Sequence, residues 1–201
     1  MIDVSAHKNL AEHTSWKVGG PAEYFFQPES VDALAKFLKE LPNDKLITWV
    51  GLGSNILIRD KGVKGVVIAT FPALNNLQMQ DSTVIAQAGV ACAQAARFSA
   101  RHHLTGLEFL AGIPGTIGGA LAMNAGCHDG ETWSRVKRVE MINRQGDCYY
   151  REPDEFTVAY REVKSPVEEW FVSAEFSLQP GEKATSLEKI RELLARRATT
   201  Q

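Results

Sequence analysis

The chain has 201 residues, of which 44% are hydrophobic and 23% are charged, and its formal net charge is −2. This near-neutral balance lacks the basic surface that proteins use to bind nucleic acids or anionic membranes. No apolar run reaches the ~18–20 residues that a membrane-spanning helix requires. We therefore expect a globular protein with no nucleic-acid or membrane partner and no obligate protein partner.

The cysteines and the N-terminal segment indicate a cytoplasmic protein. Cys92, Cys127 and Cys148 are odd in number, far apart and without CxxC spacing, which argues against a disulfide framework or a zinc site. The five histidines form no HExxH motif. The first residues are polar and lack the apolar stretch of a signal peptide. We expect no metal centre.

The first predicted elements are a helix and two strands. Residues 31–41 place apolar side chains at helical spacing after Ser30, a favoured N-cap residue. The apolar runs 45–51 and 65–71 are rich in β-branched residues and predict buried strands. We expect these elements to form a first lobe that spans residues 1–70.

A second lobe, residues 71–201, is expected to contain mixed strands and helices. Its patterns predict a strand pair, a helix of small residues, a hairpin and a strand, in that order, over residues 74–90, 91–103, 136–153 and 169–180. A final helix, 185–201, begins with the capping-box pattern of Thr185 and Glu188. Because strands and helices do not alternate regularly, the sequence favours an α+β fold.

The first glycine-rich segment is VGLGSN, residues 50–55, at the end of a predicted strand. Gly51 and Gly53 allow a sharp turn in which consecutive backbone N–H groups point into one concavity suited to an anion. The segment lacks the GxGxxG and Gly-Lys-Ser/Thr signatures of Rossmann and P-loop proteins. An ordinary strand-to-helix turn remains the alternative explanation.

The second glycine-rich segment is GIPGTIGGA, residues 112–120. Gly115, Gly118 and Gly119 remove side chains where a flat or phosphorylated ligand would lie, and Thr116 offers a hydroxyl group. Close packing of a helix on a strand is the alternative. Neither segment contains Lys or Arg, so backbone amides would hold an anion. The two segments together favour a dinucleotide that bridges two lobes.

Four segments resemble the UDP-N-acetylenolpyruvoylglucosamine reductase family: NLAEHTSWKVGGPAEYF (9–25), GLGSNILIRDKGVKGVVI (51–68), GLEFLAGIPGTIGGALAMNAGCHDGE (106–131) and VAYRE (158–162). The resemblance implies a two-lobed FAD-binding fold of the type shared with vanillyl-alcohol-oxidase-like flavoproteins. It also implies a third, substrate-binding domain, which we expect to lie outside residues 1–201.

The resemblance implies FAD as the cofactor and assigns residues to it. The pyrophosphate and ribityl chain would be surrounded by Trp49, Gly51, Leu52, Gly53, Ser54 and Asn55. The second lobe would contact the cofactor through Ile113, Thr116, Gly119, Ala125 and Gly126, with Val172 near the adenine end.

The implied activity is that of an oxidoreductase of peptidoglycan synthesis, with roles in cell wall biogenesis, cell shape and cell division. NADPH would donate a hydride through the flavin to the enolpyruvyl ether of UDP-N-acetylglucosamine. Arg161 matches the catalytic arginine of the family and would stabilise charge at the substrate carboxylate. Tyr160 matches a substrate-binding tyrosine. A solvated strand end is the alternative for both residues.

The proton-donor motif and catalytic glutamate of the family lie in its third domain, so we expect little or no turnover by this chain.

Two other functions are compatible with the sequence. A sugar or alcohol oxidase of the same fold is one alternative, and Cys127 or His128 would then be candidates for covalent flavin attachment. A nucleotide-binding module without catalysis is the other.

Overall fold

The computed structural model describes residues 4–127 and 130–200. Its helices are α1 (Val31–Glu40), α2 (Cys92–Arg101), α3 (Ile117–Ala122) and α4 (Lys183–Thr200), with 3-10 turns η1 (Leu10–His13), η2 (Glu108–Gly112), η3 (Trp133–Arg135) and η4 (Pro153–Glu155). Its strands are β1 (Val4–Asn9), β2 (Pro21–Phe26), β3 (Ile47–Val50), β4 (Val63–Ala69), β5 (Leu77–Gln80), β6 (Thr83–Gln87), β7 (Leu104–Thr105), β8 (Gly126–Cys127), β9 (Gly130–Glu131), β10 (Val136–Asn143), β11 (Cys148–Arg151), β12 (Thr157–Ala159), β13 (Glu162–Lys164), β14 (Glu169–Ser177) and β15 (Gln179–Pro180).

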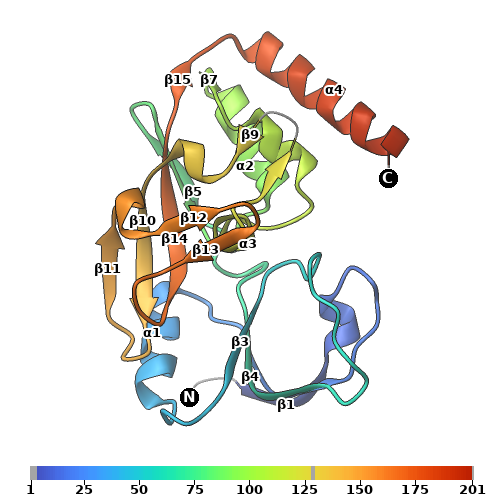
Figure 1. Cartoon of the computed structure of the whole chain (residues 1–201), viewed down its shortest axis with the longest axis vertical. Coiled ribbons are helices and arrows are strands. Elements are labelled where there is room, and N and C mark those ends of the chain that lie inside the picture. Colours follow the sequence, from blue (N-terminus) through green and yellow to red (C-terminus); the bar gives the residue numbers. More distant parts are fainter. Residues whose placement is uncertain (1–3, 128–129, 201) are drawn as a thin grey trace.

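The lower half of the molecule in Figure 1 contains a four-stranded sheet in the order β1-β2-β4-β3. The strand pair β1–β2 is antiparallel, whereas β2 and β3 each run parallel to β4. Helix α1 connects β2 to β3, as a crossover between strands on either side of β4 requires. The helix begins as the sequence predicts, because the Ser30 side chain accepts a hydrogen bond from the Ala33 backbone N–H at 3.1 Å.

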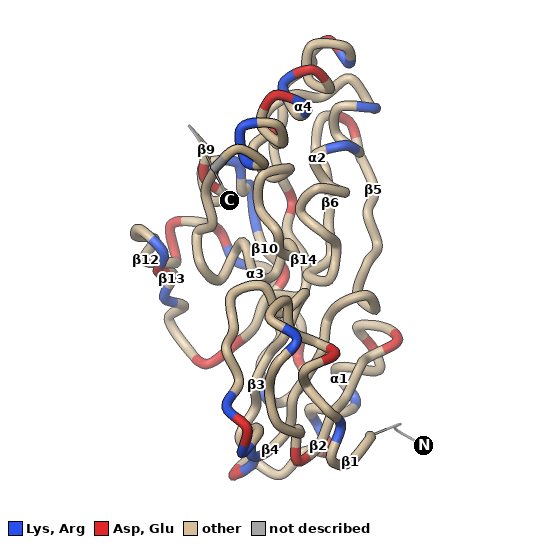
Figure 2. The backbone as a smooth tube through the Cα atoms, turned by 90° about the vertical axis from the view of Figure 1, so that its right-hand side faces the viewer, with Lys and Arg blue, Asp and Glu red and all other residues tan. Residues whose placement is uncertain are grey.

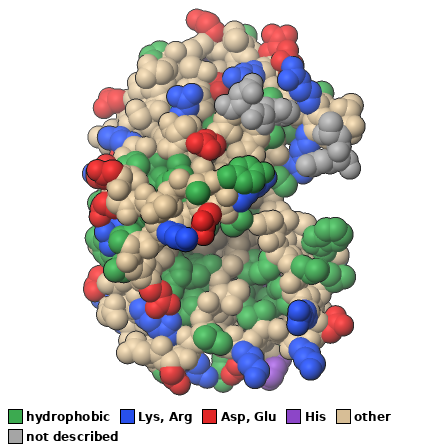
Figure 3. Space-filling view, viewed as in Figure 1, with side chains coloured by type: hydrophobic (Ala, Val, Ile, Leu, Met, Phe, Trp, Pro, Cys, Tyr) green, Lys and Arg blue, Asp and Glu red, His purple; other side chains and the backbone are tan. Residues whose placement is uncertain are grey.

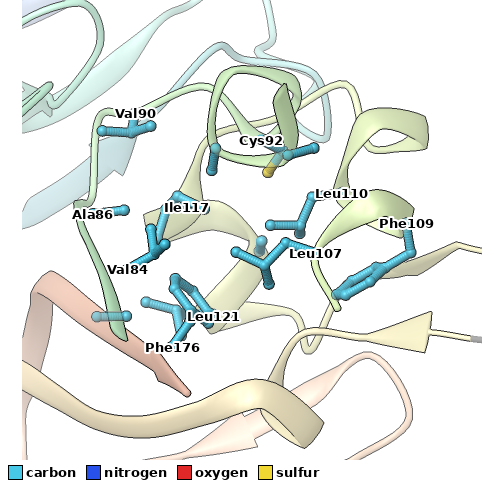
Figure 4. Close-up of a cluster of buried hydrophobic side chains, with 14 of the residues drawn as sticks. Val84, Ala86, Val90, Cys92, Leu107, Phe109, Leu110, Ile117, Leu121 and Phe176 are labelled. Atoms are coloured by element: carbon cyan, nitrogen blue, oxygen red, sulfur yellow. The ribbon is translucent and has the colours of Figure 1, made fainter. Parts of the chain in front are cut away.

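The upper half contains an antiparallel five-stranded sheet in the order β11-β10-β14-β6-β5. One face of it packs against the main hydrophobic core, which also receives apolar side chains from α2, η2, α3 and α4. Figure 4 shows Val84 and Ala86 of β6 beside Ile117 and Leu121 of α3. This packing fixes α3, and the glycine-rich segment leading into it, against the sheet.

A second apolar cluster joins the two halves. Phe26, Leu34 and Leu38 from the lower half pack with Ile142 and Val172 from the five-stranded sheet. At the same boundary the Arg144 guanidinium donates hydrogen bonds to the backbone oxygens of Pro42 and Lys45. Apolar contacts and the hydrogen bonds of Arg144 therefore hold the two halves together, so the space between the halves has defined walls.

Helix α4 lies along the upper end of the molecule (Figure 1). It begins at Lys183, and the Ser186 N–H already donates to the Glu182 carbonyl at 3.0 Å. The predicted capping box at Thr185 is therefore wrong, because the helix starts two residues earlier, soon after β15 ends at Pro180. One side of α4 is apolar and faces the core, since Ile190 is buried there and Leu187 and Leu194 pack against it.

Charged side chains are spread over both halves. Figure 2 shows Lys and Arg interspersed with Asp and Glu along α4 and in the outer loops. In the part of the chain that the structure describes, no helix is long and apolar enough to cross a membrane. The described residues also contain no group of three or more His, Cys, Asp or Glu that could hold a metal ion.

Candidate cofactor site between the two halves

The two glycine-rich segments meet at the junction between the halves. A Cβ atom on Gly51, directly after β3, would lie 2.4 Å from Oγ1 of Thr116, directly before α3. A Cβ on Gly115 would lie 3.7 Å from the Ser54 Oγ. Because Gly51 has no side chain, the first segment can approach the second this closely. Segments far apart in the sequence therefore form one surface.

Gly53 is needed for the shape of the first segment itself. Its φ is +66°, and a Cβ there would lie 1.9 Å from the backbone oxygen of His13. The Ser15 N–H donates to the Gly53 carbonyl at 3.0 Å, which fixes the N-terminal loop against the turn. A side chain at Gly53 would therefore displace this loop, whether or not a ligand is bound.

The glycines of the second segment serve two different purposes. A Cβ on Gly118 would lie 2.9 Å from the Ala88 Cβ, so this glycine allows α3 to pack closely on the segment that follows β6. A Cβ on Gly119 would meet only the Thr116 Oγ1, at 3.7 Å, and otherwise faces open space. The Thr116 hydroxyl oxygen accepts a hydrogen bond from the Gly119 N–H at 3.4 Å and so caps the N-terminus of α3. Packing explains Gly118 but not Gly119.

A cavity of about 360 Å³ opens beside these glycines. Figure 3 shows the surface hollowed between the upper and lower halves, with hydrophobic side chains gathered around the hollow. The cavity is lined by Trp49, Val50, Gly51, Thr70, Ala88, Thr116, Gly118, Gly119, Ala122, Met141, Val163, Ser165, Glu169, Trp170 and Phe171. Glycine backbone and aromatic side chains therefore both line the cavity.

Two tryptophans give the cavity a wall suited to a flat ring. The rings of Trp49 and Trp170 lie 5.3 Å apart between centroids and are inclined by 36°. Among the described residues, the buried Trp49 Nε1 has no hydrogen-bond partner. Buried indole N–H groups normally have a partner. Aromatic walls, an unused donor and a glycine edge together fit a dinucleotide with a flat ring.

Tyr160 and Arg161 form the turn of the β12–β13 hairpin. Tyr160 is 89% exposed, Arg161 has a φ of +59°, and the Arg161 guanidinium lies 5.8 Å from the centre of the Tyr160 ring. Both residues border a second hollow of about 430 Å³, together with Asn124, Gly126, Cys127, Gly130 and Glu131. The Arg161 guanidinium, a permanent cation, therefore lies at this hollow beside the segment that follows α3.

The remaining predicted site residues are placed unevenly. Ser54 faces Gly115, Leu52 and Ile113 are half-buried, and Asn55 is exposed. Ala125 is buried, and its carbonyl accepts hydrogen bonds from the backbone and hydroxyl of Thr132. Gly126 borders the second hollow with Arg161. The structure thus brings Trp49, Gly51, Thr116 and Gly119 together at the first cavity and Gly126, Tyr160 and Arg161 at the second.

Val172 lies apart from both hollows. Its side chain is fully buried among the apolar residues that join the halves, and its backbone oxygen accepts the Ala88 N–H at 2.7 Å. A cofactor contact by Val172 stays a prediction. His128, the other candidate for covalent attachment, lies outside the described residues.

Sequence reasoning missed the cavity residues of β14. Glu169, Trp170 and Phe171 are consecutive and pair in regular register with Asn143, Ile142 and Met141, yet all three line the cavity. The irregular pairing begins only beyond them, between Phe171 and Ser173. Alternation along a strand does not predict three consecutive lining residues, so the sequence pattern could not indicate them.

Comparison with known proteins gives a family for this site. The chain matches the FAD binding domain family over residues 22–149. It is 55% identical over 193 residues to a UDP-N-acetylenolpyruvoylglucosamine reductase of Legionella pneumophila (strain Corby), covering 96% of this chain and 63% of that protein. The reductase of the same name from Methylococcus capsulatus is 52% identical over 196 residues, covering 97% of this chain and 64% of that protein. The chain therefore spans less than two thirds of the length of these curated relatives.

Solved structures show the same architecture. The reductase from Thermus caldophilus superimposes with a TM-score of 0.81 at 28% identity, over 98% of this chain and 70% of that one. A 6-hydroxy-D-nicotine oxidase from Arthrobacter nicotinovorans superimposes with a TM-score of 0.65 at 16% identity, over 90% of this chain and 42% of that one, which shows a shared fold. The expected α+β, two-lobed FAD-binding fold is confirmed. The chain belongs to the FAD binding domain family, and its motif-based resemblance to UDP-N-acetylenolpyruvoylglucosamine reductases is confirmed by relatives that carry this name.

Proposed function

We propose that this chain is the FAD-binding part of an enzyme that reduces UDP-N-acetylglucosamine enolpyruvate to UDP-N-acetylmuramate with NADPH. Relatives more than 50% identical over nearly the whole chain carry the name of this reductase. FAD, when bound, supplies hydride transfer between NADPH and the substrate. The enzyme would act in peptidoglycan synthesis in the cytoplasm, and so contribute to cell shape and division.

The observation that carries this proposal is the cavity beside the two glycine-rich segments. Gly119 opens directly to it, and the Trp49 indole N–H has no partner among the described residues. The glycines would keep side chains away from the pyrophosphate region, and Trp49 would donate to a cofactor acceptor. Thr116, Ser54 and their neighbours would complete the contact from both segments.

Arg161 would hold the substrate carboxylate. Its guanidinium is a permanent cation with a planar fork that matches a carboxylate. The turn of the hairpin presents it to the second hollow, beside Gly126 and the end of the second glycine-rich segment. Charge that develops next to the carboxylate during reduction would strengthen this contact, so Arg161 would lower the barrier of that step. Tyr160 would contact the substrate from the same turn.

The two half-reactions test the role of Arg161 in a chain of the full length of its relatives. We expect Arg161→Ala to slow reduction of the enolpyruvyl substrate about 10²–10³-fold, as loss of an oxyanion-hole donor does. Arg161→Lys keeps the charge without the fork and should lie between this variant and the parent. Oxidation of NADPH should change much less, because no carboxylate charge develops in that half. Substrate reduction at the parent rate by Arg161→Ala in stopped-flow experiments would contradict the assignment.

A further inference from the structure

The β12–β13 hairpin is a separate two-stranded sheet, so its pairing does not fix its position on the rest of the protein. Among the described residues its two strands pair only with each other, and isolated hairpins of this size are marginally stable in water. The side chains of β12 are exposed, as are Glu162 and Lys164 of β13. Nevertheless the hairpin carries Arg161 at its turn and contributes Val163 to the wall of the first cavity. Val163 also packs against the main hydrophobic core, and the rest of the hairpin's position must come from contacts at its base.

One such contact is a buried carboxylate at the start of β14. The Glu169 side chain is 0% exposed and accepts a hydrogen bond from the Arg151 Nε at 2.7 Å. It also accepts hydrogen bonds from the hydroxyl groups of Tyr149 and Ser165. Ser165 directly follows β13, so this bond ties the end of the hairpin to the five-stranded sheet. Burial, together with the hydrogen bond to Glu169, raises the pKa of Tyr149 and keeps it a neutral donor.

The other end of the hairpin is tied to the same group. The Arg151 guanidinium, held by Glu169, also binds the Glu155 carboxylate at 2.5 Å. Glu155 is the last residue of η4 and lies two positions before β12. The Glu169 cluster, which consists of Tyr149, Arg151, Glu155, Ser165 and Glu169, thus holds the chain immediately before and immediately after the hairpin.

Two further contacts hold the hairpin without closing its base. Phe156, beside Glu155, packs 4.7 Å from the Trp133 ring. The Asn124 amide donates to the Ala159 carbonyl at 3.5 Å, a long hydrogen bond. Both contacts act on the first half of the hairpin. The return strand β13 packs on the main core through Val163, and the hydrogen bond from Ser165 to Glu169 joins its end to the five-stranded sheet.

We propose that Glu169 is a positioning residue, whose buried carboxylate closes the base of the β12–β13 hairpin and so fixes Arg161 and one wall of the cofactor cavity. Although Glu169 lines the cavity, its side chain is 0% exposed and its carboxylate is bound by Arg151, Tyr149 and Ser165, so it acts through the hairpin. Its importance for catalysis rests on the proposed role of Arg161. The position of the hairpin itself can be measured without substrate or cofactor.

Hydrogen exchange of residues 157–164 in the unliganded chain tests this proposal. Glu169→Gln keeps the size of the side chain but removes its charge. We expect about tenfold faster exchange in the hairpin, the size expected when charged hydrogen bonds that hold it are lost. Exchange in β4, in the other half, should not change.

Glu175→Gln is the matched control. Glu175 lies on the same strand, its side chain is 7% exposed, and it binds the Arg138 guanidinium at 2.6 Å, but it makes no contact with the hairpin in the described structure. Ser165→Ala removes one bond of the Glu169 cluster and leaves the ion pair intact, so it serves if Glu169→Gln does not fold. Ser165→Thr retains a hydroxyl and should restore slow exchange.

Faster exchange confined to the hairpin in Glu169→Gln and Ser165→Ala, with slow exchange in Glu175→Gln and Ser165→Thr, would support the proposal. Unchanged hairpin exchange in Ser165→Ala and in folded Glu169→Gln would overturn it, as would an equal increase in Glu175→Gln. If the chain fails to bind FAD, the proposed function fails, but the exchange result still decides the role of Glu169.

Discussion

Gly119→Ala should raise the stability of the unliganded chain and weaken cofactor binding. In the helix α3, alanine is favoured over glycine by about 0.5–1 kcal/mol. The new methyl group would meet only the Thr116 Oγ1, at 3.7 Å, so the protein itself accommodates it. For a chain of this size the expected rise in the melting temperature is about 1–4 °C.

The same methyl group would project into the first cavity, against the cofactor. Insertion of a methyl group into a close contact costs about 1–3 kcal/mol, which corresponds to roughly 5- to 150-fold weaker FAD binding. Thermal unfolding without FAD and a titration with FAD measure the two effects separately. Gly118→Ala is the contrast, because its Cβ would lie 2.9 Å from Ala88 and should lower stability. FAD binding by Gly119→Ala with parent affinity would refute the placement of the cofactor beside α3.

Three further substitutions or probes test the surrounding structure. Gly53→Val should destabilise the chain by about 3 kcal/mol, measured by urea unfolding, because valine at positive φ is strained and its Cβ would lie 1.9 Å from the His13 oxygen; parent stability would contradict this account. Burial raises the pKa of Glu108, but hydrogen bonds outweigh it and lower that pKa below its ordinary value of 4.5. The ionised Glu108 therefore stabilises the fold above pH 4.5, and this contribution is lost as the pH falls through the lowered pKa. Glu108→Gln should melt below the parent at pH 7 but not in acid, and an equal difference at both pH values would be inconsistent. Burial raises the pKa of Cys92 to about 12, so native protein at pH 8 should react with iodoacetamide at the exposed Cys148 and not at Cys92, as mass spectrometry of the labelled peptides would show; equal labelling would show that the core opens.

The sequence predicts the local elements well where one strong signal decides them. Ser30 and the apolar spacing after it predict α1, and the β-branched run before Gly51 predicts β3. The sequence also identifies the two glycine-rich segments, but it does not reveal the role of each glycine within them. Gly118 packs against Ala88, Gly119 faces the cavity and Gly53 forms a turn at positive φ, and only the tertiary structure distinguishes these three roles.

The rest of the site depends on features that leave no local pattern. The first residues of β14 place Trp170 and Phe171 at the cavity, whereas Val172 lies in the core that joins the halves, and a cofactor contact by Val172 stays a prediction. Glu169 of β14 and Arg151 of β11 pair across the intervening strand β10, so their contact depends on the assembled sheet and leaves no local pattern in the sequence. The α4 capping box is wrong because an earlier helix start displaces it.

Titration of the purified chain with FAD, followed by its tryptophan fluorescence, tests the central claim most directly. Trp49 and Trp170 line the cavity, so a bound flavin nucleotide should quench their emission. We expect saturable quenching with one FAD per chain and complete release of the flavin on acid precipitation, since binding is non-covalent. Absence of saturable binding would contradict the cofactor site, and flavin retained in the precipitated protein would contradict non-covalent attachment.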